Sequence, residues 1–173
     1  MTFTDPDRPA FTPVPFNPIS AAEEIVRGYP DGPAIEYGGT QAFYRPSTDT
    51  VRMPEPTRFE TNELFYSTIL HELSHSTGHS KRLNRKLDTD PNPFGTPDYG
   101  KEELVAEMSA AFLCSHAGIY PAVVENTAAY ISGWLGKLKQ DKKLVITAAG
   151  QAQKSADWIL NVKFDAVDES HGS

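Results

Sequence analysis

The 173-residue chain has the length of one domain, and its 39% hydrophobic and 23% charged content is typical of a folded globular protein. A net charge of −7 argues against a domain that grips phosphate backbones over a wide face, and a single cysteine excludes an internal disulfide framework. No apolar run reaches the roughly 20 residues that span a bilayer. We therefore expect a cytoplasmic protein with no membrane partner, in which Cys114 is a buried apolar residue.

The first third of the chain predicts an extended arm, a short helix and a small sheet. Residues 1–18 are rich in proline, which disfavours both helices and central strands. A helix is expected over Ser20–Gly28, where Gly28 ends it. Strands are expected at Ala34–Tyr37, Gln41–Arg45 and Thr50–Met53. Because Gly38-Gly39 suits a two-residue hairpin turn, we predict an antiparallel meander.

The remainder of the chain predicts helices with apolar stripes at helical spacing. The expected helices are Asn62–Gly78, Lys101–Ala117, Val124–Lys139 and Asp141–Val162. Residues 80–100 are polar and contain proline and glycine, so we expect a loop at the mouth of the site. Residues 164–173 are expected to be a flexible tail, which leaves 19–163 as the folded domain. The predicted fold class is α+β, a small antiparallel sheet packed with about five helices.

The clearest chemical signal is the pattern H-E-x-x-H, formed by His71, Glu72 and His75 inside the first long helix. Two histidines four residues apart lie about 6 Å apart along a helix axis and within about 40° of each other, so both imidazoles can reach one metal ion. Glu72 places a carboxylate beside the open coordination position, where it can accept a proton from the attacking water. The pattern indicates a zinc hydrolase.

A catalytic zinc usually takes a third protein ligand. His79 is near in sequence, but on a continued helix it would lie about 12 Å along the axis from His71. We therefore interpret His79 as a helix-end residue or as support for a ligand. Glu103 and Glu107 share one face of the next long helix, so one carboxylate can bind the metal while the other orients a ligating histidine.

The chain resembles the zincin-like metallopeptidase domain of ArdC-type antirestriction proteins and related polyvalent proteins of mobile elements. The resemblance spans about residues 20–162 and includes several ordered blocks. These are His71-Glu-Leu-Ser-His-Ser-Thr-Gly-His79, Arg82-Leu-Asn-Arg85, Glu102-Glu-Leu-Val-Ala-Glu-Met-Ser-Ala-Ala-Phe-Leu-Cys114, Glu125-Asn-Thr-Ala-Ala-Tyr-Ile131 and Trp134-Leu135. Such proteins usually carry an N-terminal domain that binds single-stranded DNA, and we expect no such domain within these 173 residues. We therefore expect nucleic acid to be involved only indirectly.

The resemblance implies a gluzincin-like fold with a Zn²⁺ cofactor. In that fold His71 and His75 are metal ligands, Glu72 is the general base and Glu103 is the third ligand. Glu107 falls where the family has an aspartate that orients a ligand. The implied activity is hydrolysis of a peptide or protein substrate.

Three further expectations concern the surroundings of the metal. Tyr99, one turn before Glu103, is a candidate for stabilising the oxyanion, and packing at the helix start is its alternative role. The meander can offer an edge strand to an extended peptide. Four basic residues follow the motif and are interpreted as a solvated face rather than a nucleic-acid contact: Lys81, Arg82, Arg85 and Lys86.

Two other functions fit the same sequence. One is a stoichiometric antirestriction or DNA-mimicking protein whose acidic surface blocks a nuclease. The other is a degenerate zincin that serves as a protein-interaction module. In both, the zinc site is mainly structural.

Overall fold

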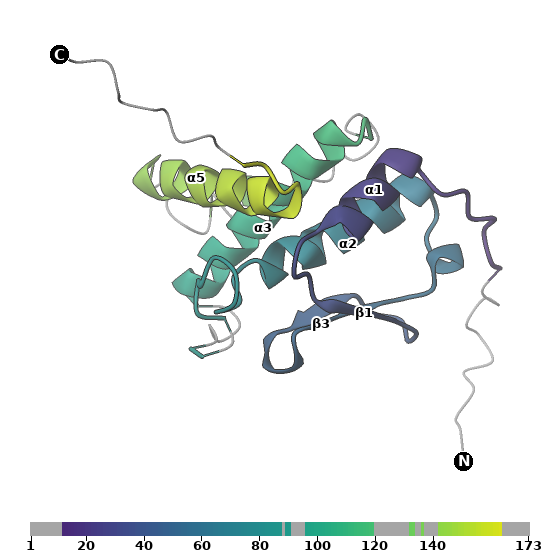
Figure 1. The fold of residues 1–173 in the computed structure, drawn as a ribbon, viewed down its shortest axis with the longest axis horizontal. Helices are drawn as coiled ribbons and strands as arrows, with labels where there is room; N and C mark the ends of the chain where they lie inside the picture. Colours follow the sequence, from purple (N-terminus) through teal and green to yellow (C-terminus); the bar gives the residue numbers. More distant parts are fainter. Residues whose placement is uncertain are drawn as a thin grey trace.

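Helix α2 (Asn62–Ser76) has the sheet on one side and helices α3 (Pro97–His116) and α5 (Lys142–Ile159) on the other (Figure 1). The computed structural model describes residues 12–87, 89–90, 96–119, 132–133, 136 and 142–163. Helix α1 (Ser20–Gly28) has the predicted bounds. The α+β class is confirmed. The described part holds four α-helices, two short 3-10 helices and one three-stranded sheet.

The sheet is mixed, so the predicted antiparallel meander is wrong. Its strand order is β1 (Ala34–Tyr37), β3 (Thr50–Met53), β2 (Phe43–Arg45). Strand β1 pairs parallel to β3, and β2 pairs antiparallel to β3. The only hairpin of the described sheet joins β2 to β3 through the 3-10 turn Pro46–Thr48, rather than β1 to β2 through Gly38-Gly39.

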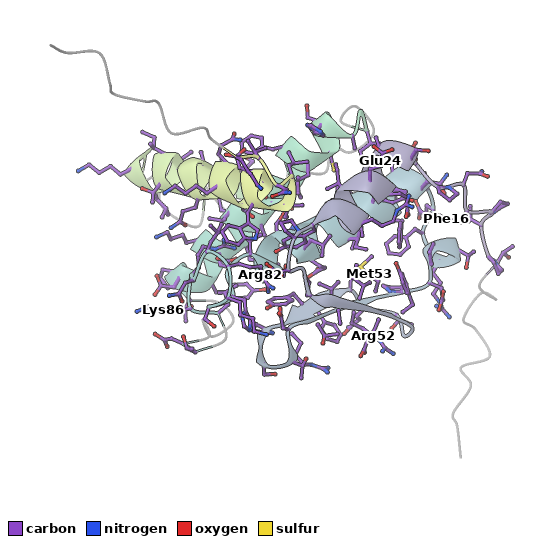
Figure 2. The ribbon with its side chains drawn as sticks, in the orientation of Figure 1. Phe16, Glu24, Arg52, Met53, Arg82 and Lys86 are labelled. Atoms are coloured by element: carbon purple, nitrogen blue, oxygen red, sulfur yellow. The ribbon has the colours of Figure 1, made fainter. Side chains whose placement is uncertain are left out.

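The burial of the strands explains this order. Val51 and Met53 on β3 are fully buried, whereas three of the four β1 residues are exposed. The most deeply buried strand takes the centre, and the link that follows β1 carries the chain past the end of β3 to its other side. Figure 2 shows Met53 on the side of the sheet that faces the helices and Arg52 on the opposite side.

Helix α2 begins where the sequence predicts and ends two residues earlier. The Thr61 hydroxyl accepts a hydrogen bond from the Leu64 amide at 3.1 Å, which satisfies one free donor of the first turn. The expected terminator, Gly78, has no left-handed φ. It is instead a point of close approach, because an added Cβ would lie 2.6 Å from Leu87 Cδ1 and 3.2 Å from Arg85 Nη2. The glycine lets the following loop fold back onto the helix end.

Helix α3 begins at Pro97, four residues before the predicted start. The Thr96 hydroxyl accepts a hydrogen bond from the Tyr99 amide at 3.2 Å, and Pro97 occupies the first helical position, which its fixed φ favours. The loop expected over residues 80–100 is therefore shorter. Of the helix expected over Val124–Lys139, only residues 132, 133 and 136 are described, and all three are helical.

The remaining sequence expectations concern the chain ends and the membrane. Residues 1–11 of the expected arm and the whole expected tail, 164–173, lie outside the described residues, so the domain bounds stay predictions.

Phe16 of the arm packs edge-to-face on Phe65, with ring centroids 5.1 Å apart. Among the described residues, none of the helices has the length and apolarity to span a bilayer.

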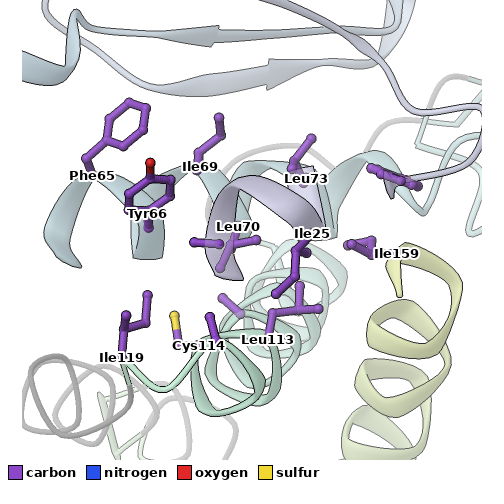
Figure 3. Packing of buried hydrophobic residues seen from close by; sticks show 14 of the residues in the cluster. Ile25, Phe65, Tyr66, Ile69, Leu70, Leu73, Leu113, Cys114, Ile119 and Ile159 are labelled. Atoms are coloured by element: carbon purple, nitrogen blue, oxygen red, sulfur yellow. The ribbon is translucent and has the colours of Figure 1, made fainter. Parts of the chain in front are cut away.

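The main core lies on both sides of α2 (Figure 3). Phe65, Ile69 and Leu73 point toward the strands, and Leu70 points toward α3. Ile25 from α1 and Ile159 from α5 complete the cluster. A second cluster joins α3 and α5 through Leu104, Val105, Ala148 and Ala152. Because α2 packs on both sides, its orientation relative to α3 is fixed.

We predict that Leu70→Ala lowers the free energy of unfolding by about 2–5 kcal/mol, because the fully buried side chain leaves a cavity between α2 and α3. Urea unfolding of the metal-free protein measures this. Ile146→Ala on α5 is the control: Ile146 is 74% exposed, so the change should stay within about 0.5 kcal/mol. Equal losses in both variants would contradict the packing described.

Candidate metal centre

Three side chains from two helices converge on one point. His71 and His75 lie one turn apart on α2, and their Nε2 atoms are 3.1 Å apart. From α3, the Glu103 carboxylate approaches within 3.7 Å of His71 Nε2 and 3.3 Å of His75 Nε2. One ligand atom from each of the three residues lies within 4.8 Å of the others. Helix α3 thus supplies the carboxylate that the histidine pair lacks.

The donor set fits a zinc ion. Tetrahedral zinc with bonds of about 2.0–2.1 Å to histidine holds two ligating nitrogens about 3.3–3.4 Å apart, close to the separation of the two Nε2 atoms. Two neutral imidazoles and one carboxylate form a common ligand set of catalytic zinc, with a fourth position left for water or substrate. His71, His75 and Glu103 are therefore the residues that would hold the ion.

Each histidine is oriented by a carboxylate on its other ring nitrogen. His71 Nδ1 lies 3.1 Å from Glu107 Oε2, and His75 Nδ1 lies 3.2 Å from Glu102 Oε1. A carboxylate that accepts the Nδ1 proton fixes the tautomer and turns Nε2 toward the metal. Glu107 lies where the sequence places the orienting acid. Glu102 has the same role toward His75, and the sequence analysis missed it.

Burial and ion pairing shift the pKa values of these groups in opposite directions. Burial alone would lower the pKa of His75, but hydrogen bonds to Glu102 and Glu103 outweigh it and raise the pKa to about 10. The pKa of His71 is also raised, because hydrogen bonds to Glu103 and Glu107 outweigh burial. Burial would raise the pKa of Glu103, but the two histidines hold it far below its usual range. In the metal-free protein Glu103 is thus ionised and His75 carries a proton at neutral pH.

Two of the four basic residues that follow the motif, Arg82 and Arg85, are not on a solvated face, so that interpretation is wrong for them: Arg82 is buried, and the Arg85 side chain is only 10% exposed. The Arg85 guanidinium donates to both oxygens of Glu102, at 2.8 and 2.7 Å. Arg82 donates to Asp49 and, through Nε, to the Ser76 carbonyl at 2.7 Å. In Figure 2 Arg82 lies in the interior, whereas the exposed Lys86 lies at the periphery. Neither arginine is available to bind nucleic acid.

A cleft of about 500 Å³ opens over the histidines and Glu103. Glu72, next to His71 on α2, lines it and is 9% exposed. Tyr99 lines it from the first turn of α3; burial and the nearby Glu103 carboxylate raise the Tyr99 pKa to about 12, so the hydroxyl keeps its proton. The other walls are Ala42, Phe43, Tyr44, Pro46, Leu87 and Glu102. The cleft therefore combines an acid-rich floor with largely apolar sides.

His79 lies apart from the three converging donors. Its ring Nδ1 accepts a hydrogen bond from the Lys81 amide at 3.2 Å, and its own amide donates to the Ser76 carbonyl at 3.1 Å. The residue is buried in the turn after α2. These contacts fit a helix-end residue, and support of a metal ligand by His79 stays a prediction.

Comparison with known proteins points to one family. The chain is 39% identical over 132 residues to the uncharacterized protein y4eC of Sinorhizobium fredii, covering 76% of this chain and 42% of that protein. It is 37% identical over 155 residues to the DNA primase TraC of Escherichia coli, covering 89% of this chain and 10% of the primase. The chain thus spans less than half the length of these curated relatives.

Solved structures of the antirestriction protein ArdC from the R388 plasmid have a similar fold. The Mn(II)-bound form superposes with a TM-score of 0.66 at 32% identity, covering 88% of this chain and 54% of ArdC. The metal-free form gives a TM-score of 0.63, also at 32% identity, and covers 53% of ArdC. A family model described as zincin-like metallopeptidase, MPTase-PolyVal, matches residues 20–151, and the chain belongs to that family.

Proposed function

We propose that this protein is a zinc-dependent peptidase in which Glu72 is the general base. The observation that carries the proposal is the convergence of His71, His75 and Glu103 at the floor of a cleft that Glu72 and Tyr99 also line. Membership of the zincin-like metallopeptidase family supports the reaction class. The Mn(II)-bound form of ArdC supports a divalent ion as the cofactor.

Each residue of the cleft has a definite task in this proposal. Zinc, when bound, supplies Lewis acidity, which polarises a carbonyl group and makes water a better nucleophile at neutral pH. Glu72 accepts the proton of the attacking water and delivers it to the leaving amine. The Tyr99 hydroxyl, which stays protonated, donates a hydrogen bond to the oxygen that becomes negative.

The sheet supports an extended peptide as the substrate. Strand β2 is an edge of the described sheet, and Ala42, Phe43 and Tyr44 on and beside it line the cleft. A peptide that pairs with such an edge obtains main-chain hydrogen bonds in a fixed register, while its alternate side chains point into the cleft. A scissile bond would in this way be held over the histidines.

A second candidate is a binding protein that counteracts restriction and uses the metal centre to brace its fold. The likeness to ArdC, an antirestriction protein by its description, favours it. In this case the chemistry of Glu72 would be irrelevant to function. The two candidates therefore differ in their response to a single substitution.

We predict that Glu72→Gln lowers the rate of peptide cleavage by about 10²–10⁴-fold or more, because the amide cannot accept the proton of the attacking water. The zinc content should stay unchanged, because Glu72 is not a metal ligand. Cleavage of a proteome-derived peptide library, read by mass spectrometry, measures the first effect, and elemental analysis measures the second. Glu63→Gln is the matched control, since it makes the same change at the start of α2, outside the cleft.

Protection of DNA in a restricting host separates the two candidates. The peptidase proposal fails if Glu72→Gln protects as well as the unaltered protein and neither cleaves any peptide of the library. If Glu72→Gln loses both cleavage and protection while Glu63→Gln keeps both, the two activities depend on the same site.

Zinc binding should also release protons. His75 has a pKa of about 10 in the metal-free protein, so at pH 7 it is protonated and must lose that proton to bind zinc. The apparent zinc affinity should therefore rise as the pH rises toward that pKa. Calorimetric titration at pH 7 in buffers of different ionisation enthalpy should show release of at least one proton per zinc. Heats that do not depend on the buffer would contradict the assignment of His75.

A further inference from the structure

We infer that Arg85 is a positioning residue of the metal centre, which sets the orientation of His75 by clamping Glu102. The inference concerns metal affinity, so it rests on the proposed function only in requiring that the site binds a metal. Whether peptides are cleaved does not affect it.

The contacts form a chain of three groups. Arg85 Nε donates to Glu102 Oε2 at 2.8 Å, and Nη2 donates to Oε1 at 2.7 Å, which is a two-pronged ion pair. The same Oε1 atom lies 3.2 Å from His75 Nδ1. The side chains of Arg85 and Glu102 are each only 10% exposed. The guanidinium thus fixes the oxygen that in turn fixes the imidazole.

The other side of the guanidinium is anchored to the end of α2. Nη1 donates to the Thr77 hydroxyl at 2.8 Å, and Nη2 also donates to the Ser74 carbonyl at 3.1 Å. Ser74 precedes His75, so one cation binds both the backbone beside the ligand and the carboxylate that orients the ligand. Arg85 therefore ties α2 to α3 at the metal centre.

The ion pair between Arg85 and Glu102 compensates the charge of a carboxylate that is largely removed from water. A buried carboxylate is costly unless it is paired, and removal of one partner leaves the other uncompensated. Without Arg85, Glu102 would lose both of the hydrogen bonds that hold its oxygens in place, and the hydrogen bond to His75 would lose its fixed direction. Loss of a group that orients a metal ligand typically lowers metal affinity by about 10–100-fold.

Gly78 makes room for this arrangement. An added Cβ there would lie 3.2 Å from Arg85 Nη2 and closer still to Leu87, so a larger residue would force the Leu87 side chain to move. The loop that carries Arg85 is thereby placed by the same turn that ends α2.

Arg82 provides a matched control on the same loop. Arg82 is buried, and like Arg85 it donates to a carbonyl of the last turn of α2, that of Ser76. Its ion pair, however, is made with Asp49 beside the sheet rather than with Glu102. Arg85→Met and Arg82→Met therefore remove the same charge and a similar anchor, and only the first removes the clamp on Glu102.

Zinc affinity of the full chain, measured by competition with a chromophoric chelator, tests the inference. We expect Arg85→Met to weaken zinc binding by about 10–100-fold and to alter the visible absorption of the Co²⁺-substituted protein. Arg82→Met should stay within about twofold of the unaltered protein with an unchanged Co²⁺ spectrum, although both variants unfold at lower temperature. Glu102→Gln should weaken binding in the same direction as Arg85→Met.

The contrary results are distinct. If Arg85→Met folds and has the same zinc affinity and Co²⁺ spectrum as the unaltered protein, the inference is overturned. The same holds if Arg82→Met loses as much zinc affinity as Arg85→Met. If Arg85→Met does not fold, Arg85→Lys replaces it: a single ammonium cannot hold both Glu102 oxygens, so affinity should fall, and unaltered affinity would overturn the inference. Absence of zinc binding in the unaltered protein would instead overturn the metal centre itself.

Discussion

Ionisable side chains crowd the crossing of α2 and α3, and the structure depends on how their charges are compensated. The group comprises His71, His75, Glu102, Glu103 and Glu107. Carboxylates taken out of water need opposite charge and hydrogen bonds around them. In the metal-free protein a proton on His75 supplies part of that charge, which is why its pKa rises to about 10. A divalent ion bound at the two Nε2 atoms would take the place of the proton on His75 and supply the positive charge. The charge of the cluster therefore suits a metal ion.

Hydrogen-bonded side-chain hydroxyls between α2, α3 and α5 allow α2 and α3 to pack closely where they cross. The Ser74 hydroxyl donates to the Leu70 carbonyl at 2.7 Å, and its oxygen lies 3.0 Å from the Ser109 hydroxyl of α3, within hydrogen-bond distance. The Thr77 and Ser155 hydroxyls lie 2.8 Å apart and join the end of α2 to α5. Small side chains at these positions let the helices approach, and their hydroxyls satisfy one another. The distance from the histidines to Glu103 is set by this packing.

The sequence was most informative where chemistry and helical spacing coincide. His71 and His75 are four apart on a strongly indicated helix, so their common face could be predicted, and Glu103 followed from the family resemblance. Glu102 was missed because it points away from the Glu103/Glu107 line, and its contact with His75 arises only from the α2–α3 crossing. No local spacing indicates such a contact.

The same limit applies to Arg85 and to the sheet. Composition predicts that an arginine in a polar loop is solvated, and only tertiary structure supplies the buried carboxylate that reverses this. The strands were located within one or two residues, but their pairing depends on which strand is buried most deeply. Val51 and Met53 decide that, because they take β3 to the centre against α2. The local hairpin signal of Gly38-Gly39 was overridden by this burial.

The most direct test of the metal centre is a crystal structure of the zinc-loaded protein with anomalous diffraction at the zinc absorption edge. The structure predicts one zinc peak within about 2.0–2.2 Å of the Nε2 atoms of His71 and His75 and of a Glu103 carboxylate oxygen. Glu102 and Glu107 should remain on the Nδ1 atoms. A zinc peak elsewhere, or ligation through Nδ1 with either carboxylate displaced, would contradict the account.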